Sequence, residues 1–302
     1  MASIILPTTE WTSSCDDLLE QVKPEDEFII VCDHETDPVV DEVPDDSVRI
    51  ETAGEPESCS GKANAVAAGL EASEDEIIIC TDGDFDREAD WRDRMVDNVE
   101  EHGAASTIPF FQIKSFVGFL LDAPVLLFGL SIFLTGTPIW GGALGFKRSD
   151  VDIETMNADL RQTVADDLLM GHYIDDVYFD TSLTTAVPTD GSPDSYLNRG
   201  IRFMRGIWYY SPMDIIAVLV TNAIFLVVTV LNPLVSIVGT TAISGLAYWY
   251  LGYRRWTFLL AFPGFFASIV MTLYGLAHKE FTWHGRRYRW ESKFDVEVFN
   301  DR

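Results

Sequence analysis

The chain has 302 residues, with 48 Asp and Glu against 21 Lys and Arg and a formal net charge of −27, yet 47% of its residues are hydrophobic. This apolar content excludes a disordered acidic chain, and the acidity argues against a nucleic-acid partner, because most of the surface would repel phosphate. Residues 1–202 carry 42 acidic and 12 basic side chains, whereas residues 203–302 carry 6 and 9. The sequence therefore predicts an acidic half followed by an apolar half.

Short apolar runs alternate with amphipathic stretches along the first 202 residues. The runs Ser3–Leu6, Phe28–Cys32 and Glu76–Cys80 are typical of strands buried on both faces. The stretches that we predict to be helices are residues 12–22, 61–72 and 88–102. Buried strands separated by helices predict an α/β domain with a mostly parallel, Rossmann-like sheet.

The acidity of this half is typical of a protein from a high-salt cytoplasm, such as a haloarchaeal one, where a carboxylate-rich surface stays hydrated; an acidic docking face is the alternative. The cysteines show no CxxC pairing, so we expect reduced core thiols in a cytosolic domain; they are Cys15, Cys32, Cys59 and Cys80. The N-terminus has no basic region and too short an apolar stretch for a signal peptide.

Polar residues follow each predicted strand, where ligands of doubly wound sheets bind. The three segments are Pro7–Glu10, Asp33–Asp37 and Thr81–Asp84. An Asp-x-Asp triplet alone is not specific, since this Asp-rich half holds three, at 82/84, 84/86 and 150/152. Asp82 and Asp84, however, leave a buried strand with a glycine between them. They can face one divalent cation that also holds a diphosphate.

A second candidate anion site precedes the third strand. Ser60 is a predicted N-cap, and a helix N-terminus with Lys62 forms an anion site. The segment is not a P-loop, because Pro56 and Ala63 stand where that motif needs Gly and Ser or Thr. A surface lysine is the alternative interpretation of Lys62.

The apolar half contains 39 consecutive residues, Ile215–Tyr253, without Asp, Glu, Lys or Arg. As one helix they would extend roughly 58 Å, about twice a bilayer core of roughly 30 Å. Asn232-Pro233 in the middle predicts a helical hairpin over about 215–231 and 234–253, followed by a third apolar segment at Thr257–Ala277. Three crossings would place the basic tail outside, against the positive-inside rule; a re-entrant or interfacial segment would resolve this, and the number of crossings stays open.

A series of short motifs runs through the chain in a fixed order. They are Pro7–Glu10, Asp33, Gly61-Lys62, Asp82-Gly83-Asp84, Trp140-Gly141-Gly142, Ala165-Asp166-Asp167, Arg199-Gly200-Ile201-Arg202-Phe203 and Thr282–Tyr288. Their order and spacing resemble those of family-2 glycosyltransferases with the GT-A fold, and most closely ceramide glucosyltransferases and similar membrane synthases. The chain departs from that pattern at three positions, Glu10, Asp166 and Phe203, where many members have Asn, Glu and Trp.

The resemblance implies a division of roles. Donor-binding residues would be Glu10, Asp33, Lys62, Asp82 and Arg199, with Mg²⁺ or Mn²⁺ held by Asp82 and Asp84.

For the other half of the reaction, the resemblance implies Asp167 as the base that deprotonates the acceptor hydroxyl and Arg202 as the residue that stabilises the departing diphosphate. Residues of the acceptor site would be Trp140, Gly141, Asp166 and Phe203. A carboxylate suits removal of a proton, and a metal with a guanidinium suits the charge of a leaving diphosphate.

The apolar run Phe116–Thr135 is long enough to span a membrane. It lies between Asp84 and Asp167, which must meet on one side of the membrane, so we expect it to lie in the interface or to dip in and return. The predicted organisation is a GT-A domain over 1–210 with this interfacial segment near 115–135, transmembrane helices over 211–278 and a basic tail over 279–302.

The sequence thus predicts a multi-pass membrane enzyme with a cytoplasmic catalytic domain. It would move a sugar, with inversion, from a nucleotide-diphosphate sugar (a UDP-sugar) to a lipid-borne hydroxyl. Two alternatives stay open: transfer to a polyprenyl phosphate, and a non-catalytic membrane scaffold that keeps the fold.

Overall fold

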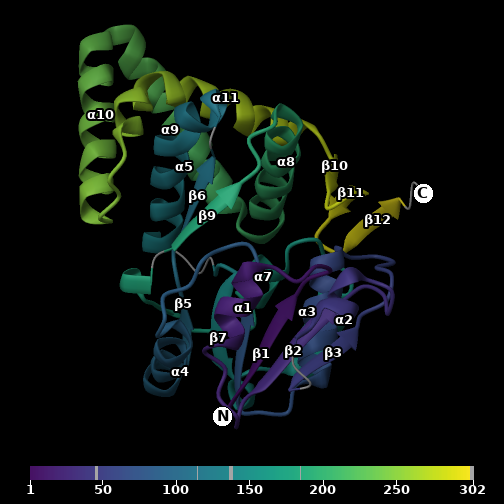
Figure 1. Cartoon of the computed structure of the whole chain (residues 1–302). Helices are drawn as coiled ribbons and strands as arrows, with labels where there is room; N and C mark the ends of the chain where they lie inside the picture. The colour runs from purple at the N-terminus through teal and green to yellow at the C-terminus, as the bar shows by residue number, and fades with distance from the viewer. Residues whose placement is uncertain (45–46, 114, 136–138, 184, 300–302) are drawn as a thin grey trace. The chain divides into compact units, whose positions relative to one another are not determined.

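The computed structural model describes residues 1–44, 47–113, 115–135, 139–183 and 185–299. The chain divides into two compact units (Figure 1). The first comprises the described residues of Met1–Phe110, Thr137–Val187 and Trp290–Asn300, and the second those of Phe111–Gly136 and Pro188–Arg289.

A seven-stranded sheet in the order β3-β2-β1-β4-β7-β5-β8 forms the centre of the first unit. The strands β1 to β4 are parallel, whereas β7 runs antiparallel to both β4 and β5. The predicted α/β class with a mostly parallel sheet is therefore confirmed. The strands are β1 (Ala2–Pro7), β2 (Glu27–Cys32), β3 (Val48–Thr52), β4 (Ile77–Thr81), β5 (Ala104–Ser106), β7 (Ala143–Lys147) and β8 (Tyr178–Phe179).

Helices pack on this sheet and connect its strands. Helix α3 packs on β1 and β2, and its Gly69 makes the close approach possible, because a Cβ there would lie 2.3 Å from Cγ2 of Ile5. The helices of this unit are α1 (Ser13–Leu19), α2 (Pro38–Glu42), α3 (Gly61–Ala72), α4 (Trp91–His102), α6 (Ile153–Leu160) and α7 (Asp166–Met170), with short 3₁₀ turns at Arg148–Asp150 and Thr181–Leu183.

The four cysteines are buried and free, as predicted. Cys80 lies in β4, where burial, with the nearby charge of Asp166 as a smaller cause, raises the pKa of its thiol to about 12. A thiol with such a pKa stays protonated at neutral pH, so Cys80 is a core residue rather than a nucleophile.

A buried ion pair fixes α4 to the loop before β2. Asp26 is fully buried and Arg92 is 5% exposed, and the guanidinium donates to the carboxylate from Nε at 2.9 Å and from Nη2 at 2.5 Å. The backbone N–H groups of Ala2 and Lys23 also donate to the carboxylate of Asp26, at 2.9 and 3.0 Å. A buried charge pair needs such additional partners to offset the cost of desolvation.

The second unit consists mainly of helices. The central one is α11, which packs against α5, α8 and α10. Close packing on α5 depends on Gly264, since a Cβ there would lie 2.0 Å from the carbonyl oxygen of Leu120. The helices are α5 (Phe116–Thr135), α8 (Pro193–Tyr210), α9 (Pro212–Leu231), α10 (Pro233–Tyr250) and α11 (Ala261–Ala277), the last preceded by a 3₁₀ turn, η3 (Trp256–Leu260).

Two helical stretches, Pro212–Leu231 and Trp256–Ala277, are long and apolar enough to cross a membrane, by length and composition alone. The predicted helix break at Asn232 is present: its side-chain oxygen accepts from the N–H of Val235 at 3.2 Å and caps α10. The number of crossings stays open.

The segment that the sequence predicts as a basic tail, 279–302, contains three strands within its described residues. β10 (Glu280–Trp283) pairs antiparallel with β11 (Arg286–Ser292), and Phe281 lies opposite Tyr288. The rings of these two residues stack at 5.5 Å. β12 (Asp295–Phe299) follows, and β6 (Pro109–Ile113) and β9 (Thr185–Thr189) form a separate two-stranded sheet.

Candidate active site

The candidate site in the first unit begins where β4 ends. The antiparallel register places Thr81, the last residue of β4, opposite Ala143, the first residue of β7. Asp82 and Gly142, the residues just beyond them, therefore lie side by side. The N–H of Asp82 donates to the carbonyl of Gly142 at 3.1 Å, and the hydroxyl of Thr81 donates to the same carbonyl at 2.9 Å. The predicted metal-binding segment and the Gly-Gly segment are thus joined through their backbones.

Lys62 lies in the first turn of α3 and contacts two carboxylates. Its Nζ lies 2.7 Å from Oδ1 of Asp82 and 3.4 Å from Oδ2 of Asp166. Burial alone would lower the pKa of Lys62, but the negative charges of Asp166, Asp82 and Asp167 outweigh it and raise the pKa. Lys62 is therefore a charged, half-buried member of the cluster and not a surface lysine.

Ser60 ties the start of α3 to the segment that carries the acidic pair. Its hydroxyl oxygen accepts from the N–H of Ala63 at 3.0 Å, which confirms the predicted N-cap. The hydroxyl donates to the carbonyl of Val164 at 2.9 Å, and the Ser60 N–H donates to the carbonyl of Thr163 at 2.9 Å. These bonds set the distance between Lys62 and Asp166.

The acidic pair begins α7 and lies against Gly141. Asp166 is buried, and Oδ2 of its carboxylate has the ion pair with Lys62 but no hydrogen bond within the described residues. Asp167 is half-buried and its Oδ1 accepts from the N–H of Leu168 at 2.8 Å. A Cβ on Gly141 would lie 2.8 Å from Oδ2 of Asp166 and 3.1 Å from Cβ of Asp167, so a larger residue would have to displace the acidic pair.

Trp140 and Phe85 are buried aromatic residues that pack against each other in this region. Trp140 is buried, and its ring lies 5.0 Å from that of Phe85. A Cβ on Gly142 would lie 2.3 Å from the Trp140 ring, which explains the second glycine of the segment. The Trp140 ring thus packs against the backbone at Gly142.

Arg87 is a residue of this site that sequence reasoning missed. Its guanidinium donates to the hydroxyl of Thr81 at 2.7 Å, to the carbonyl of Asp82, and to the hydroxyl and carbonyl oxygens of Ser14 at 2.7 and 3.0 Å. Its Cζ also lies 4.3 Å from the centre of the Phe85 ring. Burial lowers the pKa of Arg87 to about 10, so it stays charged at neutral pH. Arg87 holds the loop that carries Asp82.

We expect Arg87→Met to weaken metal-dependent donor binding by about tenfold, because the loop loses several charge-assisted hydrogen bonds. The measurement is nucleotide-sugar binding at increasing Mn²⁺ concentration. Arg94→Met is the matched control: Arg94 lies on α4 and pairs with Glu88 and Asp180 at 3.3 and 3.1 Å. Both changes should lower thermal stability, but only Arg87→Met should shift the metal dependence; an equal shift in both would exclude a positioning role.

Glu10 and Asp33 follow β1 and β2, which are parallel to β4 and end at the same edge of the sheet. Glu10 is exposed, and its N–H and carbonyl form a local turn with the hydroxyl of Thr8 at 3.3 and 2.7 Å. The N–H of Asp33 donates to the carboxylate of Asp37 at 2.9 Å. Both predicted donor-binding residues thus lie on the loops at that edge.

The remaining predicted residues lie on α8 in the second unit. The Cζ of Arg202 lies 3.7 Å from the ring centre of Trp283 in β10 and 5.4 Å from that of Phe203. Arg199 donates to the hydroxyl of Thr189 at 3.2 Å. Arg202 thus lies against Trp283, an aromatic residue of the motif Thr282–Tyr288.

The carboxylates of Asp82 and Asp84, which follow β4, suit a hard divalent cation. No group of three or more His, Cys, Asp or Glu side chains that could hold a metal occurs within residues 1–44, 47–113, 115–135, 139–183 and 185–299. Asp82 is partly exposed and Asp84 is exposed, so two carboxylates are accessible. Mg²⁺ and similar ions often bind through one or two carboxylates plus the phosphates of a substrate. The two carboxylates of Asp82 and Asp84 are consistent with this kind of binding.

Comparisons with known proteins bear on the class of this α/β unit. Residues 12–124 match the family model described as glycosyl transferase family 2. The match covers the four helices α1 to α4 and the four strands β2 to β5 of the sheet, together with Lys62, Asp82, Asp84 and Arg87. It supports the predicted enzyme class independently of the motifs in the later part of the chain.

Among solved structures, the mannosyltransferase PcManGT from Pyrobaculum calidifontis in complex with GDP-Man and Mn²⁺ is 18% identical, with 90% of this chain and 86% of that chain covered and a TM-score of 0.46. Glucosyl-3-phosphoglycerate synthase from Mycobacterium tuberculosis, in complex with Mn²⁺, UDP and glucosyl-3-phosphoglycerate, is 14% identical, with 62% and 70% covered and a TM-score of 0.41. Likenesses this distant do not bear on the substrates of this chain. No curated protein sequence matches it.

Proposed function

We propose that this protein is a metal-dependent, inverting glycosyltransferase that moves a sugar from a nucleotide-diphosphate sugar, a UDP-sugar, to a lipid-borne hydroxyl at the membrane. The observation that carries the proposal is the cluster of Lys62, Asp82 and Asp166 beside Gly141, at the edge of the sheet where ligands bind. The family match over residues 12–124 supports the same reaction class.

The chain supplies three kinds of group for this reaction. Asp82 and Asp84 would hold Mg²⁺ or Mn²⁺, which neutralises charge on the donor diphosphate. Lys62 is held in its charged form and can pair with a phosphate oxygen. Asp33, with Glu10, is proposed to contact the nucleoside.

In the proposed step, Asp167 removes the proton of the acceptor hydroxyl while that oxygen forms a bond to the anomeric carbon of the sugar. The bond from this carbon to the diphosphate breaks, and the diphosphate leaves with the electron pair. Arg202 and Arg199 keep the role that the resemblance implies, as partners of the leaving diphosphate. The residues that we assign to the acceptor side are Trp140, Gly141, Asp166 and Phe203.

The membrane location is proposed from the second unit. The stretches Pro212–Leu231 and Trp256–Ala277 are apolar and long enough to cross, and α10 completes the proposed hairpin. A catalytic unit on the cytoplasmic side, where nucleotide sugars are made, would then act on a lipid acceptor in a multi-pass protein.

A panel of radiolabelled sugar nucleotides, incubated with the full-length protein and a total lipid extract, tests this function. We expect one donor to give labelled lipid, no product in the presence of a chelator, and recovery on addition of Mn²⁺ or Mg²⁺. Equal transfer with the chelator would contradict the role of the metal. Neither transfer nor donor hydrolysis above background would favour the non-catalytic scaffold.

A further inference from the structure

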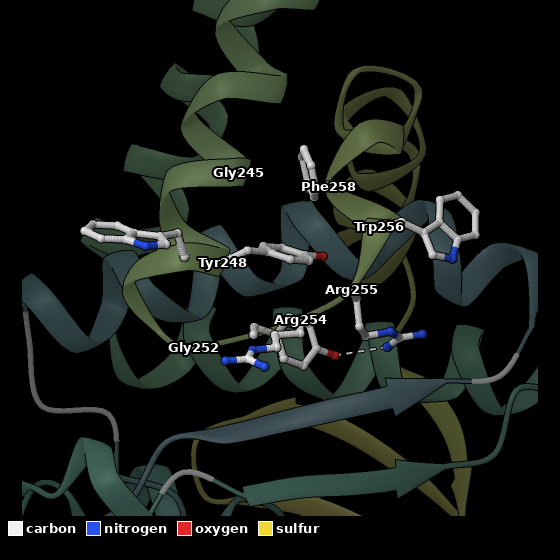
Figure 2. Close-up of a pocket in the computed structure, with 9 residues that line it drawn as sticks. Gly245, Tyr248, Gly252, Arg254, Arg255, Trp256 and Phe258 are labelled. Atoms are coloured by element: carbon white, nitrogen blue, oxygen red, sulfur yellow. Dashed lines mark hydrogen bonds between the residues drawn. The ribbon is translucent and has the colours of Figure 1, made fainter.

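A cavity of about 540 Å³ lies in the second unit, at the turn between α10 and η3. Its lining combines two arginines, Arg254 and Arg255, with several aromatic side chains. In Figure 2 the two arginines lie on one side of the Tyr248 ring, and Gly245 and Phe258 lie on the other. The cavity therefore has a basic end and an apolar end.

The two arginines differ in what they already contact. Arg255 lies 3.1 Å from the carboxylate of Asp122 on α5 and donates to the hydroxyl of Tyr253 at 3.0 Å. Asp122 in turn accepts from Thr257 at 2.5 Å. Arg254 is exposed and has no ion pair with any described residue. The charges of Arg254, Arg255 and Asp122 add up to one net positive charge at the cavity.

The surface around the cavity is apolar. Trp249, Tyr250 and Trp256 are 80%, 68% and 58% exposed, and Leu246 and Leu259 are 64% and 58% exposed. Tryptophan and tyrosine beside arginine at the end of an apolar helix are typical of the boundary between hydrocarbon and water. The basic end of the cavity would then face the headgroup layer, and the apolar end the acyl chains.

We propose that this cavity binds the phosphodiester headgroup of an anionic phospholipid. Its single net positive charge matches the single negative charge of such a headgroup. A zwitterionic lipid would bring an additional cation towards Arg254 and bind less well. The proposal goes beyond the transfer reaction and does not depend on it.

Binding of dioctanoyl phosphatidylglycerol to the full-length protein in an uncharged detergent, measured by calorimetry, tests the proposal. We expect this lipid to bind at least about fivefold more tightly than dioctanoyl phosphatidylcholine, and Arg254→Gln to lose about fivefold, the equivalent of about 1 kcal/mol. Arg254→Lys should keep most of the affinity, since it keeps the charge. Because the exposed Arg254 side chain has no ion pair to lose, these variants should fold normally, which thermal unfolding verifies.

Arg289→Gln is the matched control. Arg289 lies in the same unit, is 40% exposed and pairs with Glu280 at 2.5 Å, so this change should leave lipid binding unaltered. The proposal is wrong if Arg254→Gln binds phosphatidylglycerol as the parent protein does, if Arg289→Gln loses as much, or if phosphatidylcholine binds equally well. Competition by inorganic phosphate at the same concentration would identify a site for free phosphate and also overturn it.

Discussion

Asp82→Asn and Asp84→Asn are each expected to abolish metal-dependent donor binding and sugar transfer together. Each change removes one of the two carboxylates that would hold the cation, and an amide is a poorer ligand for a hard metal ion. The measurements are nucleotide-sugar binding with and without Mn²⁺ and transfer to the lipid product.

Asp86→Asn is the matched control, because Asp86 lies on the same loop and is exposed. It should keep binding and transfer close to those of the parent protein. Normal metal-dependent binding in Asp82→Asn or Asp84→Asn would place the cation elsewhere.

Asp167→Asn is expected to lower transfer to a hydroxyl acceptor by about 10² to 10⁴ while donor binding stays nearly intact, since a positioned general base contributes about that much. Transfer at saturating donor, beside donor affinity, separates the two effects. Thermal unfolding of the variant checks that the start of α7 is preserved.

Two other outcomes would be informative for Asp167→Asn. If most transfer survives, the acceptor is already ionised, and the polyprenyl phosphate alternative replaces the hydroxyl. If the variant loses metal-dependent nucleotide binding as completely as Asp84→Asn does, the acidic pair belongs to the donor site and the proposed division of roles is wrong.

The strands that sequence predicts and those it misses differ in burial. The runs in β1, β2 and β4 are almost wholly buried, so their apolar residues are continuous and easily recognised. β3 is an edge strand with Arg49 and Glu51 among its five residues, so it lacks that pattern. For β7, no local pattern indicates that it enters the sheet antiparallel, because tertiary pairing sets that direction.

Motif order predicts which residues gather in the first unit but not how they contact one another. The contact of Lys62 with Asp166 depends on the Ser60 bonds to Thr163 and Val164, residues about 100 positions away along the chain. Arg87 carries no signal in the sequence, since an arginine in an acidic loop normally indicates a solvated side chain.

The strands of the last segment carry a local signal in the sequence. Its basic residues suggested a tail, yet Phe281 and Tyr288 lie in two short runs in which apolar and polar residues alternate, the pattern of half-buried strands. Net charge alone carries no information about strands, whereas this alternation does.

The contact between Lys62 and Asp82 has a thermodynamic consequence. In the ligand-free protein a cation that approaches Asp82 must displace an ammonium group that already lies 2.7 Å away, so the metal alone should bind weakly. In the proposed site a diphosphate would offer Lys62 new oxygen partners and would release the carboxylate of Asp82 to the metal. Metal and donor would then raise each other's affinity by the same factor, and we expect the protein to remain largely metal-free until a nucleotide sugar arrives.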